Sequence, residues 1–236
     1  MEGLGMDRVN ASQWKIIEQE FKPEYLQHYE TIFTLGNGYL GTRGNLEEKY
    51  AESNPGTFIA GTYDQAPEEV TELPKSANWT AIELKLAGER FDLKRGEIIN
   101  YQRILNLKQG ILQRRVKWKS PQGKITNIIF KRFVSRADDH KFGLKLKLKP
   151  ENYSGTVKIT SGLDGQVTNS GTQHFIEQEK SALQEESGIY LLQRTQKSDI
   201  DVALAATHNL NSEGFTEEYK IARRQINYCL TGEVTS

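Results

Sequence analysis

The sequence is poor in cysteine and in long apolar runs. Cys229 is the only cysteine among 236 residues, so no disulfide bond can form within the chain, which suits a reducing compartment. No segment approaches the roughly 20 consecutive apolar residues that a membrane-spanning helix needs. Residues 1–8 lack the apolar core of a secretory signal peptide. We therefore expect a cytoplasmic protein without a membrane partner.

Net charge is also absent. Lysine and arginine account for 31 residues, and aspartate and glutamate account for 31 as well. A neutral chain lacks the basic surface that is typical of nucleic-acid-binding proteins, so we expect no nucleic acid as a partner. The four histidines, His28, His140, His174 and His208, are scattered without the spacing of a metal site. We accordingly expect no metal.

What the sequence does have is alternation with a period of two. Apolar residues at every second position of 142–148 alternate with lysine and glycine, and residues 112–119 and 200–210 repeat this pattern. Such alternation is typical of strands with one face on a core and the other in water. Turn formers such as Pro121–Gly123 separate the strands. The spacing favours an all-β fold in one domain of 236 residues.

Three polar or reactive side chains fall among apolar ones. Arg114 lies on the apolar face of its strand and needs a partner there. His208 also lies on an apolar strand face, where a hydrogen-bonded structural role is commoner than catalysis. Cys229, between Tyr228 and Leu230, is typical of a small buried apolar residue.

Glycine is concentrated in residues 36–44, which contain four of the 20 glycines. Residues 36–41 match the G-x-G-x-x-G pattern of dinucleotide-binding loops, and Asp64 lies where a ribose-binding acid would be expected. That fingerprint requires a helix to begin inside the motif, and residues 42–45 interrupt one. A tight β-turn, for which Asn37–Gly38 is a typical pair, is the better interpretation.

Residues 30–48, ETIFTLGNGYLGTRGNLEE, closely resemble the N-terminal signature of glycoside hydrolase family 65, the maltose, trehalose and kojibiose phosphorylases. The resemblance continues in order along almost the whole chain, through residues 58–64, 74–79, 88–93, 105–114, 132–135 and 161–169. It implies a large antiparallel two-sheet β-sandwich, a supersandwich of the galactose mutarotase type, at residues 1–236. It further implies a helical linker, an (α/α)6 barrel and a small C-terminal β-domain beyond them. Sandwiches of this family run somewhat further, so the last strands would be missing here and an open sheet edge would remain.

The same resemblance implies an activity for the parent enzyme. It would cleave α-linked glucosyl disaccharides by inverting phosphorolysis, a glycosyl transfer to inorganic phosphate that yields β-glucose 1-phosphate without a cofactor. Cleavage needs an acid that protonates the leaving oxygen, and in this family that acid is a glutamate of the barrel. No residue here matches its motif, so we expect no catalytic residue and no activity in this chain alone. Hydrolysis instead of phosphorolysis, the identity of the disaccharide and a homodimer remain open.

Five residues are candidates for lining the substrate pocket or docking on the barrel in cis. Aromatic faces bind the C–H surfaces of sugars, planar polar groups bind their hydroxyls, and a loop rich in glycine exposes its backbone. The candidates are Asn37, Tyr39, Arg43, Glu47 and Trp79.

Glu47 and Glu48 are not expected to act as a catalytic pair, because neighbours on a strand point to opposite faces. Solvated carboxylates, or one ion pair with Arg43, are the simpler interpretation. The alternative function is a self-standing carbohydrate-binding module. Such a module would carry carbohydrate on an aromatic platform in a polar surface, whereas a domain that packs on a barrel would leave an apolar patch.

Overall fold

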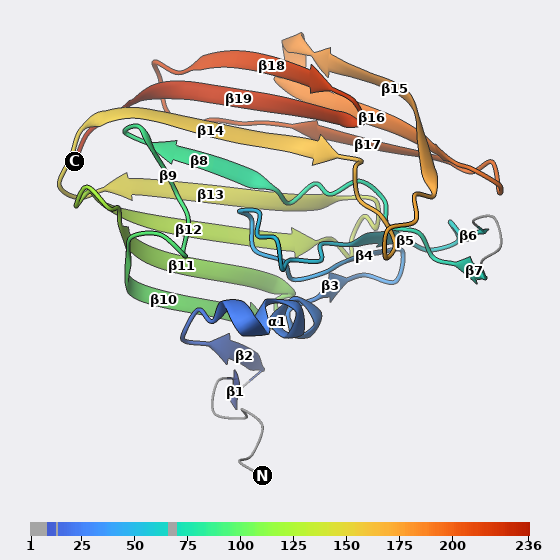
Figure 1. The fold of residues 1–236 in the computed structure, drawn as a ribbon, viewed down its shortest axis with the longest axis horizontal. Helices are drawn as coiled ribbons and strands as arrows, with labels where there is room; N and C mark the ends of the chain where they lie inside the picture. The colour runs from blue at the N-terminus through green and yellow to red at the C-terminus, as the bar shows by residue number, and fades with distance from the viewer. Residues whose placement is uncertain (1–8, 13, 66–69) are drawn as a thin grey trace.

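The computed structural model describes residues 9–12, 14–65 and 70–236, and antiparallel β-strands dominate it (Figure 1). The prediction of an all-β chain is confirmed. Helical structure in the described part is limited to α1 (Leu26–Ile32) and two short 3-10 turns, η2 (Pro23–Tyr25) and η3 (Gln184–Glu186). No helix in that part is long and apolar enough to cross a membrane.

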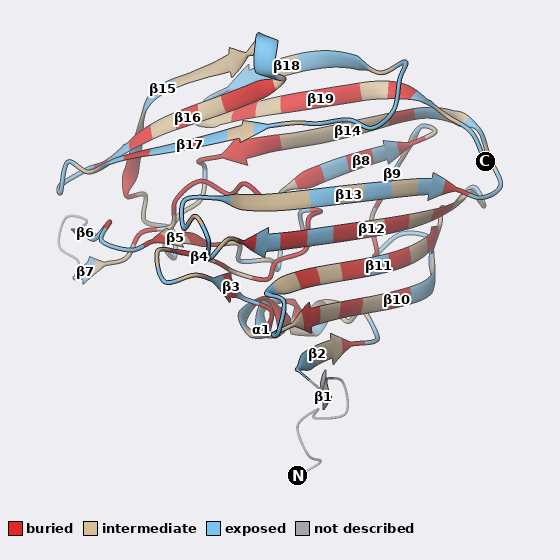
Figure 2. Cartoon of the chain, turned by 180° about the vertical axis from the view of Figure 1, so that it is seen from behind, coloured by how far each residue is buried: buried red, intermediate tan, exposed pale blue. Residues whose placement is uncertain are grey.

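The largest sheet has six antiparallel strands. Its order is β1 (Val9–Ser12), β2 (Lys15–Glu18), β10 (Glu97–Asn106), β11 (Ile111–Lys119), β12 (Ile125–Val134) and β13 (Phe142–Pro150). The predicted hairpin at Pro121 joins β11 to β12, and their register is regular from Ile111↔Phe133 to Lys119↔Ile125. Alternation buries every second residue of both strands, which Figure 2 shows as alternating red bands.

A second sheet has five strands and a third has three. The five-stranded order is β18 (Thr216–Ala222), β19 (Gln225–Val234), β14 (Gly155–Asp164), β8 (Ile82–Leu86) and β9 (Glu89–Arg90). The three-stranded sheet contains β15 (Phe175–Leu183), β16 (Gly188–Thr195) and β17 (Asp201–Thr207). The predicted strand 200–210 is therefore confirmed at β17, although it ends earlier than the apolar pattern does.

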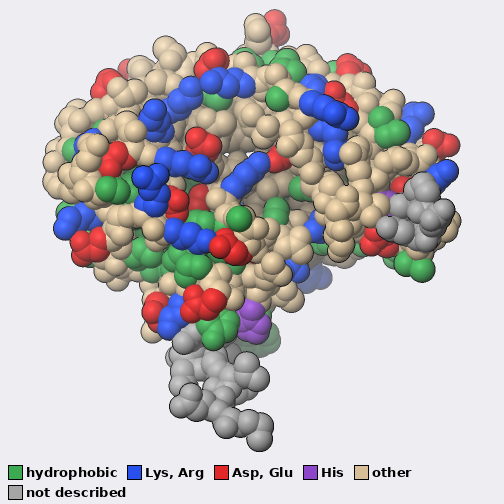
Figure 3. All heavy atoms as spheres, in the orientation of Figure 1, with side chains coloured by type: hydrophobic (Ala, Val, Ile, Leu, Met, Phe, Trp, Pro, Cys, Tyr) green, Lys and Arg blue, Asp and Glu red, His purple; other side chains and the backbone are tan. Residues whose placement is uncertain are grey.

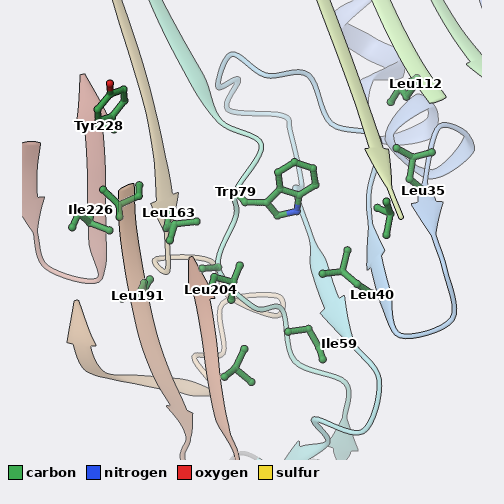
Figure 4. Packing of buried hydrophobic residues seen from close by; sticks show 14 of the residues in the cluster. Leu35, Leu40, Ile59, Trp79, Leu112, Leu163, Leu191, Leu204, Ile226 and Tyr228 are labelled. Atoms are coloured by element: carbon green, nitrogen blue, oxygen red, sulfur yellow. The ribbon is translucent and has the colours of Figure 1, made fainter. Parts of the chain in front are cut away.

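Two clusters of buried apolar residues join these sheets. In one cluster, Trp118 and Phe130 of the six-stranded sheet pack together with Leu84 and Val157 of the five-stranded sheet. The other cluster surrounds Trp79, whose ring lies among apolar side chains from several elements in Figure 4. Inner faces of different sheets therefore share their core, which is why each needs only one apolar face.

The glycine run folds as a small antiparallel meander of β3 (Leu35–Gly36), β4 (Leu40–Thr42) and β5 (Thr57–Ile59). The tight turn between β3 and β4 is confirmed, but its central residues are Gly38 and Tyr39 rather than Asn37 and Gly38. Gly38 has φ 99°, and the Asn37 side-chain oxygen accepts the amides of Tyr39 and Leu40 at 2.9 and 2.8 Å. Because β-structure follows the run where a helix would be needed, a dinucleotide-binding loop is excluded.

The acidic segment after the meander, residues 64–74, is described only in part. Residues 66–69 lie outside the described residues, and so do residues 1–8, on which the signal-peptide argument rests. Of the rest, β7 (Thr71–Glu72) pairs with β6 (Asp64–Gln65) as a short two-stranded sheet. The described part of this segment is therefore extended.

Candidate functional site

The acidic pair at the end of the glycine run is buried around one arginine. Glu47 and Glu48 are 3% and 4% exposed, and Arg114 of β11 is 2% exposed. Arg114 donates to Glu47 Oε2 and to Glu48 Oε1, both at 2.6 Å, and a further bond joins it to Glu48 Oε2. The expectation of solvated carboxylates, or of a pair with Arg43, is therefore wrong. Both carboxylates reach one partner because residues 45–50 are irregular, not a strand.

The prediction that Arg114 lies on the apolar face of its strand and needs a partner there is confirmed. Burial lowers the pKa of its guanidinium, but the attraction of Glu48 and Glu47 outweighs burial and holds the pKa well above its usual value. Both acids are acceptors in these bonds, so neither is free to donate a proton to a substrate. The guanidinium also stacks on the Phe130 ring, 4.5 Å from its centroid. The cluster is a closed structural unit rather than a catalytic pair.

Two further buried arginines extend this cluster across neighbouring strands. Arg132 of β12 lies 3.5 Å from Glu47 and donates to the Asn45 carbonyl, and burial lowers the pKa of its guanidinium to about 10. Arg103 of β10 lies 3.4 Å from Glu18, whose carboxyl pKa is raised by burial. The cluster therefore fixes the irregular segment 45–50 against the six-stranded sheet.

Arg43 pairs with a different acid from the one predicted. It lies 3.6 Å from Glu30 of α1, which is fully buried, and it donates to the Gln27 carbonyl at 3.1 Å. Glu30 also accepts the Asn54 amide at 2.9 Å and the Ser53 hydroxyl. Arg43 thus ties the meander to α1.

Asn37 and Tyr39 are brought together with the loop between β12 and β13. The Asn37 amide donates to the carbonyls of Ser135 and Asp139 at 2.6 and 2.8 Å. The half-buried Tyr39 ring lies 4.2 Å from the exposed His140 ring, centroid to centroid. Of the five candidates, these two therefore share one end of the six-stranded sheet.

Trp79 lies apart from that turn surface and is buried. It is 7% exposed, and its ring centroid lies 4.3 Å from that of Phe142. Its environment is the apolar cluster of Figure 4, which offers no open platform for a sugar. In this chain Trp79 is a core residue.

A buried histidine between two carboxylates was missed by sequence reasoning. His174 Nδ1 lies 3.1 Å from Asp64, and Nε2 lies 2.7 Å from Glu72. Asp64, the supposed ribose acid, also accepts the amides of Lys197 and Ser198 at 3.0 and 2.9 Å. Although burial raises the pKa of Asp64, the bonds from Ser198 and His174 outweigh it, and that pKa is lowered. The three residues come from separate segments, so no spacing in the sequence signals them.

His208 and Cys229 have the structural roles that were predicted. His208 faces the Ser187 carbonyl and the Ser161 hydroxyl at 3.0 and 3.2 Å, and burial lowers its pKa. Cys229 is a free thiol, 1% exposed.

A cleft of about 250 Å³ lies beside the acidic pair, lined by Asn45 to Tyr50, Asn78 and Asp164 among others. Its carboxylates already have partners: Glu47 and Glu48 bind Arg114, and Asp164 binds Lys49. Among the described residues, Asp138, Asp139 and His140 are the group whose ligand atoms lie within 4.8 Å of one another. Asp138 pairs with Lys141 at 2.9 Å, and the group is mainly exposed.

The buried acids Glu47, Glu48, Asp64 and Asp164 thus bind side chains of the domain itself. Residues 16–235 match the family model described as glycosyl hydrolase family 65, N-terminal domain. The chain belongs to glycosyl hydrolase family 65. The resemblance seen in residues 30–48 is thereby confirmed.

The relatives of this chain include proteins described as phosphorylases. A kojibiose phosphorylase from Halothermothrix orenii is 46% identical over 217 residues, covering 90% of this chain and 28% of that protein. An α,α-trehalose phosphorylase from Thermoanaerobacter brockii is 38% identical over 171 residues, covering 66% of this chain and 22% of that protein. This chain therefore spans less than a third of the curated relatives that it matches.

A solved structure has the same fold as this family 65 chain. It is described as a putative kojibiose phosphorylase from the human microbiome, and it superposes with a TM-score of 0.82 at 20% identity. The match covers 96% of this chain and 33% of that one. The region described here therefore corresponds to one part of a longer chain.

Proposed function

We propose that this chain is the N-terminal β-sandwich of a longer enzyme that cleaves an α-linked glucosyl disaccharide by inverting phosphorolysis, releasing β-glucose 1-phosphate. Inorganic phosphate is the co-substrate, and no cofactor is needed. The observation that carries the proposal is the family match over residues 16–235 together with relatives that are phosphorylases. The six- and five-stranded sheets, which share a core, supply the two layers of the sandwich.

The fragment itself is non-catalytic in this proposal. Inverting phosphorolysis needs a single acid from the protein, because phosphate is the nucleophile on the opposite face of the sugar. Glu47 and Glu48, the adjacent acids that most resemble a catalytic pair, are buried and accept hydrogen bonds from Arg114. They therefore cannot reach a glycosidic oxygen. The acid must then come from the missing catalytic barrel in cis.

We further propose that the turn at Asn37–Leu40 and the β12–β13 loop form a surface that docks on this barrel and shapes its pocket. Tyr39 and His140 present a pair of rings there, and the Asn37 bonds to Ser135 and Asp139 hold the turn on the loop. Arg43 and Glu47 lie behind this surface, where their ion pairs hold the chain around the meander in place. Trp79 supports the surface by packing in the apolar cluster that includes Leu40 of the meander.

The test of the activity compares the longer gene product with the 236-residue chain. Each is incubated with kojibiose, trehalose or maltose, with and without inorganic phosphate, and products are followed by phosphorus and proton NMR. We expect the longer protein to release β-glucose 1-phosphate only with phosphate, and the short chain to release nothing. Free glucose without phosphate would mean hydrolysis, and turnover by the short chain would contradict its non-catalytic role.

The docking surface is tested by Tyr39→Ala in the longer enzyme. Removing the ring from a docked, pocket-shaping turn should lower kcat/KM about tenfold, a loss of about 1.4 kcal/mol of transition-state stabilisation. Tyr190→Ala is the control, because Tyr190 lies on β16 and its hydroxyl donates to the exposed Glu179. Equal kcat/KM for Tyr39→Ala and the parent would refute this role.

A further inference from the structure

The outer face of the five-stranded sheet carries a cleft of about 530 Å³ beside the turn between β8 and β9. This face is opposite the one on which Leu84 and Leu86 are buried. The cleft lies where β8, β14 and β19 run side by side in Figure 1. Ligand sites in proteins usually have volumes of about 300–1,000 Å³, so the cleft is large enough for a small molecule. Its lining contains two lysines and no carboxylate.

Small residues line one end of the cleft. Ala87 and Gly88 form the tight turn from β8 into β9, with φ 44° and 90°. Gly155 begins β14 next to this turn, and a Cβ atom there would lie 3.1 Å from the Ala87 Cβ. The other end is lined by the long side chains of Lys85 and Lys158. The contrast between short and long side chains leaves the cleft open toward the lysines.

A row of three cations crosses the sheet at this cleft. Lys85 of β8 lies directly opposite Lys158 of β14 on one side and directly opposite Arg90 of β9 on the other. Like charges that lie directly opposite each other destabilise a strand pair. In Figure 3, which has the orientation of Figure 1, Lys and Arg side chains gather over β8 and β14. An anion bound at this row would relieve the repulsion.

Carboxylates of the same face neutralise the two lysines of the cleft only in part. Lys85 is exposed and forms no ion pair with any described residue. Lys158 Nζ lies 3.6 Å from Glu218, and that carboxylate is shared with Lys220 at 3.5 Å. Glu83 lies on the same face of β8, two residues before Lys85, but does not line the cleft. The cleft therefore retains positive charge.

We propose that this cleft binds a phosphate group, carried as inorganic phosphate or as a phosphate monoester. Such a group has a charge of about −1.5 to −2 at pH 7, which matches Lys85 and Lys158, whereas a carboxylate would neutralise only one of them. Lysine binds phosphate as a point charge. Thr231 adds a hydroxyl to the lining, and the other threonine there, Thr156, already donates its hydroxyl to Glu233.

Solvation by water is the other explanation for lysines on the outer face of a sheet. It treats every exposed lysine alike and leads to no saturable binding of an anion. The chain offers a direct comparison, because Lys145 of β13 also lies opposite a lysine, Lys131 of β12, and neither of them lines the cleft. A site in the cleft therefore depends on Lys85 and not on Lys145.

The test is isothermal titration calorimetry of the 236-residue chain, which contains the whole cleft, at constant ionic strength. Inorganic phosphate and glucose 6-phosphate are the probes, and acetate and glucose are the controls for charge and for the sugar. We expect saturable binding of a phosphate probe with a Kd below about 1 mM, and binding of both controls at least about tenfold weaker. Tighter binding of glucose 6-phosphate than of phosphate would identify a monoester as the ligand, and the reverse order would identify the free anion.

Substitutions locate the binding. Lys85→Ala should raise the Kd at least about tenfold, and Lys145→Ala should leave it unchanged. Lys85→Glu should abolish binding and, without ligand, should raise the melting temperature by about 1–3 °C, because the new carboxylate would lie between Lys158 and Arg90. Since a rise in melting temperature requires a folded chain, this variant excludes misfolding as the cause of lost binding.

Two results would overturn the proposal. One is the absence of saturable phosphate binding below about 10 mM, and the other is an equal Kd for Lys85→Ala and Lys145→Ala. Binding is measured without turnover, so either result leaves the proposed activity untouched.

Discussion

At the residue scale, the feature that matters most is the group of buried charges around Arg114. Removing ions from water costs several kcal/mol each, and attraction compensates only when the pairing is close and hydrogen-bonded. Arg114 meets this condition with two carboxylates at 2.6 Å. Its contribution is to hold the irregular segment 45–50 in one conformation on the sheet.

Replacing Arg114 should therefore be severe. Arg114→Met leaves Glu48 buried without its cation and leaves Glu47 with Arg132 alone, so we expect a loss of about 3–5 kcal/mol in the free energy of unfolding. Arg115→Met is the matched control, because Arg115 is the next residue of β11 and is exposed. It should change stability by less than about 0.5 kcal/mol. Urea unfolding of both variants is the measurement, and similar losses would contradict the assigned role.

How far the sequence predicts this cluster depends on sequence separation. Alternation in β11 predicts that Arg114 faces the core and requires a partner. It cannot identify that partner, because Glu47 lies 67 residues earlier in the chain. The strand rule that separates neighbouring side chains also misleads for Glu47 and Glu48, since their segment is not a strand. The grouping of His174 with Asp64 and Glu72 was missed for the same reason, because these acids lie 110 and 102 residues before the histidine.

At the element scale, the glycines of the meander have different causes. Gly38 has φ 99° in the turn, where other residues would be strained. A side chain at Gly44 would lie 2.6 Å from the Phe33 backbone, because the Gly44 amide bonds to the Glu30 carbonyl at 2.7 Å. Gly41 has open space around it. Only a structure separates these cases, because the sequence shows four equal glycines.

Two alanine substitutions test this distinction. Gly44→Ala should destabilise the chain by about 1–3 kcal/mol, because the new methyl group meets backbone that cannot move aside cheaply. Gly41→Ala meets no atom within 4 Å and has no positive φ, so it should be nearly neutral. The measurement is the melting temperature of each variant. A larger fall in melting temperature for Gly41→Ala than for Gly44→Ala would show that the close backbone approach does not explain the glycine at position 44.

Long strands were predicted better than short ones. Alternation from Leu112 to Lys119 predicts β11, which begins one residue earlier at Ile111. β6 and β7 have two residues each and lack a period to detect. β9, Glu89–Arg90, is equally short.

At the scale of the whole molecule, the chain belongs to glycosyl hydrolase family 65 and matches its N-terminal domain over residues 16–235. It covers 28% of the kojibiose phosphorylase from Halothermothrix orenii. The sequence resemblance predicted the family, and the family match confirms it. The sugar is not predicted by the fold, because one fold can serve many activities.

The most direct test of this account is the size of the native gene product. An antiserum against this chain is used to blot lysate of the source cells, beside the purified chain of 26.9 kDa. We predict one band more than three times heavier, in line with the 28% coverage of a relative. A band at the mass of the chain itself would contradict the central claim and would leave an independent carbohydrate-binding module as the function to pursue.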